Sequence, residues 1–433
     1  MTKRRRQVKT VHTAKHVANP DVKWLIAILC VHAALAAVYW HYTPFGAPPD
    51  EGPHGLYVQT LVEEHTLPVF DVSDRQRYES HQPPLYYLMG VPFYLIGQVV
   101  RMGEPAVAVR LLSMLLGALS ILVIYRAVLL AFPRERHVAL ASAGFAALLP
   151  THVMLSSSVG NDILAEVIFG LAVLVMVRII LDGPSWRTTV ALGAVLGLGL
   201  LTKTTCVLLF PAAVLAYGLV WRRGTSGLTS ATRHIGVLVC VSVAVGGWWL
   251  VRNQALYGDV LAMSQFRRAF EHTARPEYWL NRGFSGVEYW LLVGLWTFHS
   301  FWGVFGHMNV FMPSWAYIGL AATSLCVIVA CLRVEIELRA ESAQTRDILL
   351  IYNVVLLLVL LAFLQFNASY FQTQGRYLYP ALVPISAFWV LGVRRLLPAR
   401  MRSWMPYAAA SVPLIAQVVA LATCIVPKMP FYL

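Results

Sequence analysis

Charged residues are scarce in this chain of 433 residues, where Asp, Glu, Lys and Arg make up only 13% of the sequence. Soluble domains carry about a quarter charged residues and do not sustain long, repeated apolar runs. Here hydrophobic residues reach 58%, and the mean hydropathy is +0.63. The composition therefore excludes an ordinary soluble protein and predicts an all-α polytopic membrane protein, since open sheets cannot satisfy their backbone groups in lipid.

Cysteine pairing and internal repeats are also absent. The six cysteines all fall within apolar runs, without the spacing of disulfide pairs or metal ligands: Cys30, Cys206, Cys240, Cys326, Cys331 and Cys424. They indicate small core residues rather than a disulfide framework. The net charge of +13 does not indicate nucleic acid, because Lys and Arg collect in the cytoplasmic loops of membrane proteins. No separate soluble domain is expected.

Apolar runs that suit the ~30 Å of bilayer hydrocarbon recur along the chain. They lie near residues 24–42, 84–100, 107–131, 138–156, 163–181, 188–201, 204–221, 234–251, 287–306, 313–332, 348–366, 377–397 and 405–426. Two of them are doubtful as crossings, because 84–100 carries Pro92 at its middle and 287–306 is aromatic and broken by glycines. Both suit the membrane interface, where Tyr and Trp are favoured.

The distribution of Lys and Arg decides between the topologies. If both doubtful runs lie outside, 22 of the 34 Lys and Arg residues are cytoplasmic, whereas a crossing at 84–100 gives 17 on each side. We therefore predict about 11 crossings (11–13), with an uncleaved cytoplasmic tail over 1–23 and one transmembrane domain over 24–433. The first outer loop (43–106) would carry an interfacial helix, and a long outer loop would cover 252–312.

Ionisable residues gather at the predicted extracytoplasmic boundary, where they are costly and usually functional. Asp50 and Glu51 follow Ala-Pro-Pro at the end of the first run, and adjacent carboxylates repel unless cations face them. Asp162 opens a later run, Lys203 joins two others, and Arg376 precedes another. Such a set suits group transfer from an anionic leaving group, with cations holding a phosphate and a carboxylate as general base.

Plainer interpretations compete with each of these assignments. Lys203 can instead cap a helix or snorkel toward the membrane surface, and Arg376 can be a boundary anchor. Arg75 lies in a polar stretch that favours a solvated charge cluster with Asp71, Asp74, Arg77 and Glu79. Single loop histidines such as His54 and His81 are weak signals by themselves.

The order of several motifs resembles the GT-C membrane glycosyltransferases, especially the protein O-mannosyltransferase and aminoarabinose transferase group (glycosyltransferase 39-like). The segments "PPDEGPHGLYVQTLVEEHTLP" and "SHQPPLYYLMGVPFYLIG" are similar to that group's first outer loop, with an acidic motif and a Pro-containing interfacial helix. The similarity continues through "VGNDILAEVIFGLAVLVM", "LGLGLLTKTTCVLLFPA" and "QGRYLYPALVPISAF". It covers most of residues 24–400.

The resemblance implies a GT-C fold and transfer of a sugar, with inversion, from a polyprenyl-phosphate donor to a lipid, glycan or protein acceptor. The reaction would take place on the extracytoplasmic face of a bacterial cell membrane. The implied site comprises catalytic Asp50, Glu51 and Asp162, donor-phosphate ligands Lys203, Arg376 and His81, and further candidates His54, Arg75, Arg252 and Tyr87. No cofactor is firmly expected, and a divalent metal among Asp50, Glu51, His54 and Asp162 stays an alternative.

One departure affects the phosphate site. Aminoarabinose transferases have a Lys just before the Pro of the outer-loop helix, where this chain has Gln82, so that contact is absent or moves to His81 or Arg75. Two other functions stay open. A transporter or flippase of lipid-linked sugars would not need adjacent carboxylates and often shows internal repeats. A non-catalytic envelope assembly protein could share the fold.

Overall fold

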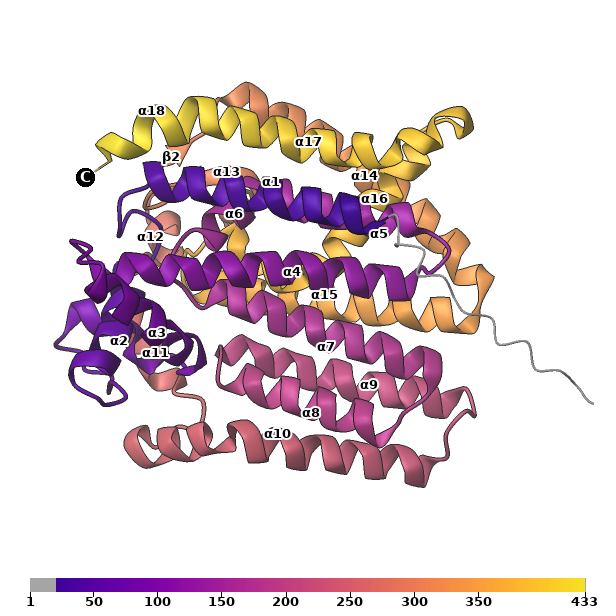
Figure 1. Cartoon of the computed structure of the whole chain (residues 1–433), viewed down its shortest axis with the longest axis horizontal. Helices are drawn as coiled ribbons and strands as arrows, with labels where there is room; N and C mark the ends of the chain where they lie inside the picture. The colour runs from indigo at the N-terminus through magenta and orange to yellow at the C-terminus, as the bar shows by residue number, and fades with distance from the viewer. Residues whose placement is uncertain (1–20, 433) are drawn as a thin grey trace, which may run out of the picture.

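The computed structural model describes residues 21–432, so most of the expected cytoplasmic tail lies outside the described residues. Within that range nearly all regular structure is helical, and two short strands pair antiparallel, β1 (Val304–Phe305) with β2 (Val310–Phe311). Figure 1 shows the long helices lying roughly side by side along the longest axis of the molecule. The predicted all-α polytopic architecture is confirmed.

Over residues 21–432, nine helical segments are long and apolar enough to cross a membrane. They are α1 (Asp21–Tyr42), η2 (Pro105–Val109) with α4 (Arg110–Ala131), α7 (Asp162–Asp182), η3 (Thr204–Leu208) with α9 (Leu209–Arg222), α10 (Leu228–Tyr257), α14 (Ser314–Glu341), α15 (Ala343–Ser369), η4 (Gly375–Ala381) with α16 (Leu382–Leu396), and the run of η5 (Ala399–Trp404), α17 (Met405–Ala420), η6 (Leu421–Ile425), α18 (Val426–Lys428) and η7 (Met429–Phe431).

A further crossing is broken. α5 (Arg136–Leu148) and α6 (Pro150–Ser156) are bent by 70° and make a tenth span if counted as one. The apolar α8 (Trp186–Leu200), with 15 residues, would complete the expected eleven. That number stays a prediction, because α8 is short for a crossing. Its start is well defined, since Ser185 and Thr188 form a capping box.

The core lies around α7, which packs against α4, α8, α9 and α15. Most of its side chains are buried, from Ile163 to Ile180. A helix that is apolar on all sides is expected where other helices surround it. Because Asp162 begins this helix, the candidate carboxylate is anchored to the most enclosed part of the bundle.

The short elements gather at one end of the bundle, at the left of Figure 1, which we call the α2 end. They are α2 (Glu51–Glu63), η1 (Arg75–His81), α3 (Leu85–Val99), α11 (Met263–Ala269) and α12 (Pro276–Leu280). α1 begins at the opposite end, and the chain terminates at the α2 end.

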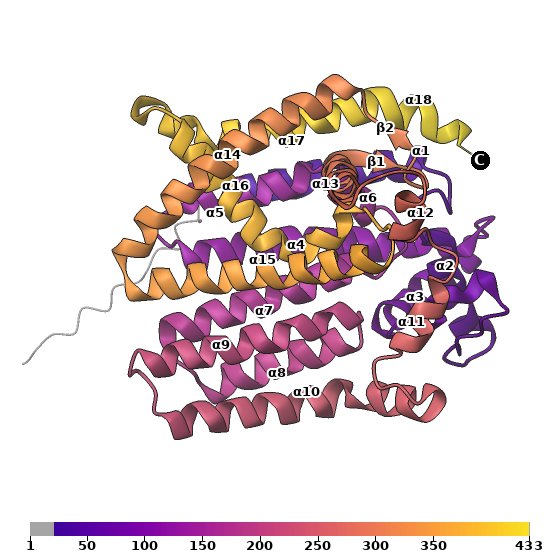
Figure 2. The same cartoon turned by 180° about the vertical axis from the view of Figure 1, so that it is seen from behind.

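α13 (Gly286–Gly303) differs in direction from the long helices. Figure 2 shows it nearly end-on, so it runs across the bundle. This direction agrees with the interfacial placement expected for 287–306. The placement of both doubtful runs relative to a membrane remains a prediction.

Candidate active site

Asp50 lies in a turn just before α2 that separates its side chain from that of its acidic neighbour. Asp50 is the residue before the first residue of α2, and its backbone is left-handed (φ 65°), which is uncommon for a residue with a Cβ and must be held by surrounding contacts. The Asp50 side chain is 29% exposed, whereas Glu51 is fully buried. Asp50 lines a cavity of about 300 Å³ together with Pro49, Tyr78 and Gln374. The two carboxylates therefore face different surroundings.

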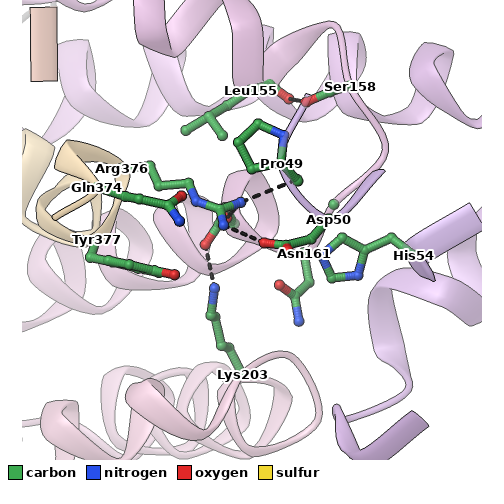
Figure 3. A network of polar contacts seen from close by, with 12 residues as sticks. Pro49, Asp50, His54, Leu155, Ser158, Asn161, Lys203, Gln374, Arg376 and Tyr377 are labelled. Atoms are coloured by element: carbon green, nitrogen blue, oxygen red, sulfur yellow. Dashed lines mark hydrogen bonds and ion pairs between the residues drawn. The ribbon is translucent and has the colours of Figure 1, made fainter. Parts of the chain in front are cut away.

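Four charged side chains meet at this turn. Arg376 lies between two carboxylates: its Nη2 donates to Asp50, and its Nη1 donates to Asp162 Oδ2 at 3.1 Å. The Lys203 ammonium donates to the other oxygen of Asp162. Figure 3 shows Lys203 approaching this group from the side opposite Pro49. Two carboxylates and two cations, as far apart in the sequence as 326 residues, thus form one network.

Close packing fixes Arg376 in this position. Gly375 lies so near α13 that a Cβ would overlap the backbone of Phe301, and its N–H donates to Ser300 Oγ at 2.7 Å. The ring of Tyr377 lies 5.3 Å from the Arg376 guanidinium and 5.9 Å from the Lys203 ammonium. An aromatic face at these distances adds a favourable cation–π interaction with both cations.

A second buried polar layer lies beneath the network. Glu166, one turn beyond Asp162 on α7, faces His152 Nε2 at 3.0 Å. The His152 ring in turn stacks on Tyr379, with ring centroids 6.3 Å apart. This layer joins α6, α7 and η4 in the bundle core. The elements that carry Asp162 and Arg376 are therefore held together at two levels.

The electrostatics of Asp50 follow from this arrangement. Burial raises the pKa of the Asp50 carboxyl, but Arg376, His54 and the Tyr78 hydroxyl outweigh it and lower the pKa to about 2. Tyr78 donates to Asp50 Oδ1 at 2.5 Å. Asp50 is consequently a carboxylate at neutral pH, and in this arrangement it is a weak base.

Glu51 also lines the cavity of about 300 Å³, but its carboxylate is fully buried and paired in the interior. Its oxygens accept from Arg110 Nε and Nη2, both at 2.7 Å, and from the backbone N–H groups of Gly46 (2.9 Å) and Val159 (3.0 Å). Arg110 is also buried and donates to the carbonyls of Trp40, Thr43 and Pro44. Sequence reasoning missed Arg110, which sits inside an apolar run without any local signal.

Glu79 was expected in a solvated charge cluster, and that prediction is wrong. The residue is only 5% exposed, and its Oε2 has no hydrogen-bond partner among the described residues. Burial raises the pKa of the Glu79 carboxyl, although the nearby His54 opposes this effect. His54 is itself buried, lies 2.8 Å from the hydroxyl of Tyr87, and has its pKa lowered by burial. Glu79, His54 and Tyr87 thus form a buried polar group next to the network of Asp50, Asp162, Lys203 and Arg376.

The remaining candidates form no hydrogen bond or ion pair with Lys203 or Arg376 within the described residues. His81 Nδ1 donates to the Tyr78 carbonyl at 2.7 Å, and burial lowers the His81 pKa to about 4. It is therefore neutral at pH 7, which does not favour its expected role as a phosphate ligand. Arg252 donates to the carbonyls of Leu67 and Pro68, so it fastens the first loop to α10. The Arg75 side chain lies outside the described part of the structure.

Metal ligation was left open by the sequence. Among residues 21–432, no group of three or more His, Cys, Asp or Glu side chains is arranged to hold a metal ion. Both oxygens of Asp162 are already engaged by cations. Gln82, which stands in place of the expected Lys, accepts from the Asn161 side chain at 3.2 Å.

Comparison with known proteins supports the GT-C fold that the sequence predicts. Residues 82–249 match the family described as dolichyl-phosphate-mannose-protein mannosyltransferase. No curated protein matches the sequence at a significant level. The comparison with solved structures is more extensive and covers almost the whole chain.

Two solved proteins are representative. The Archaeoglobus fulgidus oligosaccharyltransferase AglB, solved with an inhibitory peptide and a dolichol-phosphate, matches with a TM-score of 0.58 and 14% identity over 94% of this chain and 56% of that one. Apo ArnT from Cupriavidus metallidurans matches with a TM-score of 0.56 and 15% identity over 96% of this chain and 77% of that one. ArnT bound to undecaprenyl phosphate gives a TM-score of 0.53 at 15% identity, over 95% and 74% of the two chains.

This chain spans about half the length of the archaeal proteins that it matches. At such identities the likeness establishes the fold. The predicted GT-C fold is therefore confirmed, and the chain is a multi-pass membrane protein of that architecture.

Proposed function

We propose that this chain, which has the fold of the GT-C membrane glycosyltransferases, moves a sugar from a polyprenyl-phosphate carrier to an acceptor on the extracytoplasmic face. The observation that carries the proposal is the network in which Arg376 links Asp50 to Asp162 beside Lys203. A phosphate leaving group needs fixed cations, and an acceptor hydroxyl needs a carboxylate. The likeness to proteins solved with dolichol-phosphate and undecaprenyl phosphate supports this type of carrier.

In the proposed step, an acceptor hydroxyl attacks the anomeric carbon from the face opposite the phosphate. Its proton passes to Asp50, the bond between the anomeric carbon and the phosphate oxygen breaks, and the anomeric centre is inverted. Arg376 and Lys203 stabilise the negative charge that develops on the leaving phosphate. Asp162 holds both cations in position before the donor arrives.

Donor binding and base strength are coupled in this scheme. Without donor, Arg376 is the largest of the effects that lower the pKa of Asp50 to about 2, which makes the carboxylate a poor proton acceptor. A donor phosphate competes for the same guanidinium. When the phosphate binds the Arg376 guanidinium, it neutralises part of the positive charge that lowers the pKa of Asp50, and burial acts to raise that pKa. The base would thus become active only when a donor is present, and the coupling is reciprocal.

Glu51 has a positioning role in this scheme. Its buried ion pair with Arg110 holds the start of α2, and Asp50 is the preceding residue. Tyr78 orients the Asp50 carboxylate by donating to Oδ1. Neither Glu51 nor Arg110 needs to contact the substrate.

The variant Asp50→Asn tests the proposal. Membranes that contain the protein and their own lipid-linked sugars are incubated, and the release of free polyprenyl phosphate is measured by mass spectrometry. Loss of a general base should slow this release by about 10²–10⁴-fold. Binding of undecaprenyl phosphate, used as the probe, should persist. Asp71→Asn is the matched control, because Asp71 is an exposed carboxylate of the same loop.

The other outcomes separate the competing functions. Unchanged release in Asp50→Asn contradicts the assigned base. Movement of a lipid-linked sugar across vesicles without release of its carrier identifies a transporter. A wild-type protein that neither retains the probe nor releases carrier indicates an assembly protein.

A further inference from the structure

A second charged cavity lies at the end of the bundle opposite the α2 end. It has a volume of about 630 Å³ and is lined by Arg222, Arg223, Arg339, Arg346 and Leu350. These residues come from the last turn of α9, the last turns of α14 and the first turns of α15. Figure 2 shows these helix ends together at the left edge of the bundle. We call this site the arginine cavity.

The wall of the arginine cavity is organised by one buried carboxylate. Asp347 is 1% exposed and lies 3.3 Å from both Arg222 Nη2 and Arg223 Nε. Arg223 is held further by its Nη2, which donates to the carbonyl of Ile180. Its Nη1 has no hydrogen-bond partner among the described residues. Arg223 is therefore fixed in the wall of the arginine cavity, where its positive charge is only shared with Asp347.

The balance of charge in the arginine cavity is positive. Besides Asp347, only Glu335 neutralises a lining arginine within the described structure, through a contact of 2.5 Å with Arg339. Arg346 is exposed and forms no ion pair among residues 21–432. The lining therefore has four guanidinium groups, and only two carboxylates pair with them in the described structure. The cavity has the chemistry of a site for phosphate oxygens, which guanidinium groups bind in a bidentate manner.

Exposed apolar residues of α14 and α15 share helix faces with arginines of the arginine cavity. On α14, Leu332, Ile336 and Arg339 share one face by helical periodicity, and the first two are 58% and 71% exposed. On α15, Leu350 and the exposed Leu357 share a face with Arg346 in the same way. A soluble anion would not need these two strips, whereas acyl chains would lie along them.

We propose that the arginine cavity binds the phosphate headgroup of an anionic phospholipid whose acyl chains lie on these apolar strips. The predicted topology assigns this end to the cytoplasmic leaflet, where basic pockets between transmembrane helices bind anionic headgroups. The site is separate from the candidate active site and does not depend on glycosyl transfer. Its ligand is recognised by one phosphate and two hydrophobic tails.

Native mass spectrometry of the full chain, purified in detergent and titrated with phosphatidylglycerol, tests this site. The double variant Arg339→Ala/Arg346→Ala should retain this lipid about 30-fold less well, from about 1 kcal/mol per lost cation. The matched control is Arg187→Ala/Arg233→Ala, which removes two exposed arginines of α8 and α10 outside the cavity. The control should retain the lipid like the wild type.

Both double variants should elute as folded protein, because the Arg339–Glu335 pair lies within one helix and is partly exposed. Equal retention in the cavity variant and the wild type overturns the proposal. An equal loss of lipid retention in the control also overturns the proposal, because the loss would then follow from the lower positive charge of the whole protein and not from the arginine cavity. A parallel arm uses inorganic phosphate: if it protects the wild type from heat as well as phosphatidylglycerol does, the ligand is a soluble anion and the lipid assignment fails.

Discussion

Replacing Glu51 by glutamine should destabilise the fold by about 3–5 kcal/mol, the cost of leaving a buried charge without its partner. The guanidinium of Arg110 is only 1% exposed, so water cannot replace the lost carboxylate. Glutamine keeps one acceptor oxygen, but its amide group turns two further hydrogens toward the Arg110 donors. The substitution therefore removes the counter-charge and adds a donor–donor conflict at the same place.

Four hydrogen bonds depend on this carboxylate. Two come from Arg110 at 2.7 Å, and the others come from the backbone N–H groups of Gly46 and Val159. Hydrogen bonds to charged groups contribute about 1.5–3 kcal/mol each, but they are not additive. The loss of stability in Glu51→Gln should therefore equal the cost of removing one partner from a buried ion pair, about 3–5 kcal/mol, and not the sum of the four hydrogen bonds.

Reversible unfolding in mixed detergent micelles measures the effect. The matched control is Glu64→Gln, at the other end of α2, where Glu64 and Arg77 are 2.9 Å apart and 47% and 36% exposed. An exposed pair of this kind contributes about 0–1 kcal/mol. The reasoning is refuted if Glu51→Gln costs no more stability than Glu64→Gln. Loss of glycosyl transfer at full stability would instead assign Glu51 to the chemistry.

Other predictions concern the network and its neighbours. Arg376→Ala should weaken retention of undecaprenyl phosphate at least about tenfold. The control Arg282→Ala, which removes an exposed arginine of the long loop, should leave this retention unchanged. Unchanged affinity in Arg376→Ala would contradict a role of Arg376 in the phosphate site. Because the pKa of Asp50 falls from 3.8 to about 2 on folding, its ionised form stabilises the protein above about pH 4 and loses this effect toward pH 2. The thermal stability of the wild type should thus approach that of Asp50→Asn over this range, and a constant difference would contradict the ion pair. His81→Gln should leave probe retention within about twofold, because a histidine of pKa about 4 carries no charge at pH 7; a larger loss would restore it as a phosphate ligand.

The class of protein could be predicted from composition alone. Repeated apolar runs leave few choices besides a helical bundle, because only helices satisfy their backbone groups within a single segment in lipid. The positions of Asp50, Lys203 and Arg376 at the edges of such runs were also visible in the sequence. An ionisable side chain at an apolar boundary stands out whatever its partner is.

What the sequence could not supply was the partner of each charge. Glu51 and Asp50 are neighbours in the chain, yet a left-handed turn separates their side chains. Glu51 pairs with Arg110 in the interior, and Asp50 pairs with Arg376. Glu79 looked solvated because its neighbours are polar, although the packed loop buries it.

The arginine cavity likewise exists only in three dimensions. Its lining residues are distributed over three helices, and Asp347 on α15 brings Arg222 and Arg223 of α9 to it. Hydrophobic periodicity is local and acts within a few turns, so helices, their apolar faces and the residues at their ends could be predicted from the sequence. Ion pairs depend on which ends meet, and that was decided by the packing of helices far apart in the chain.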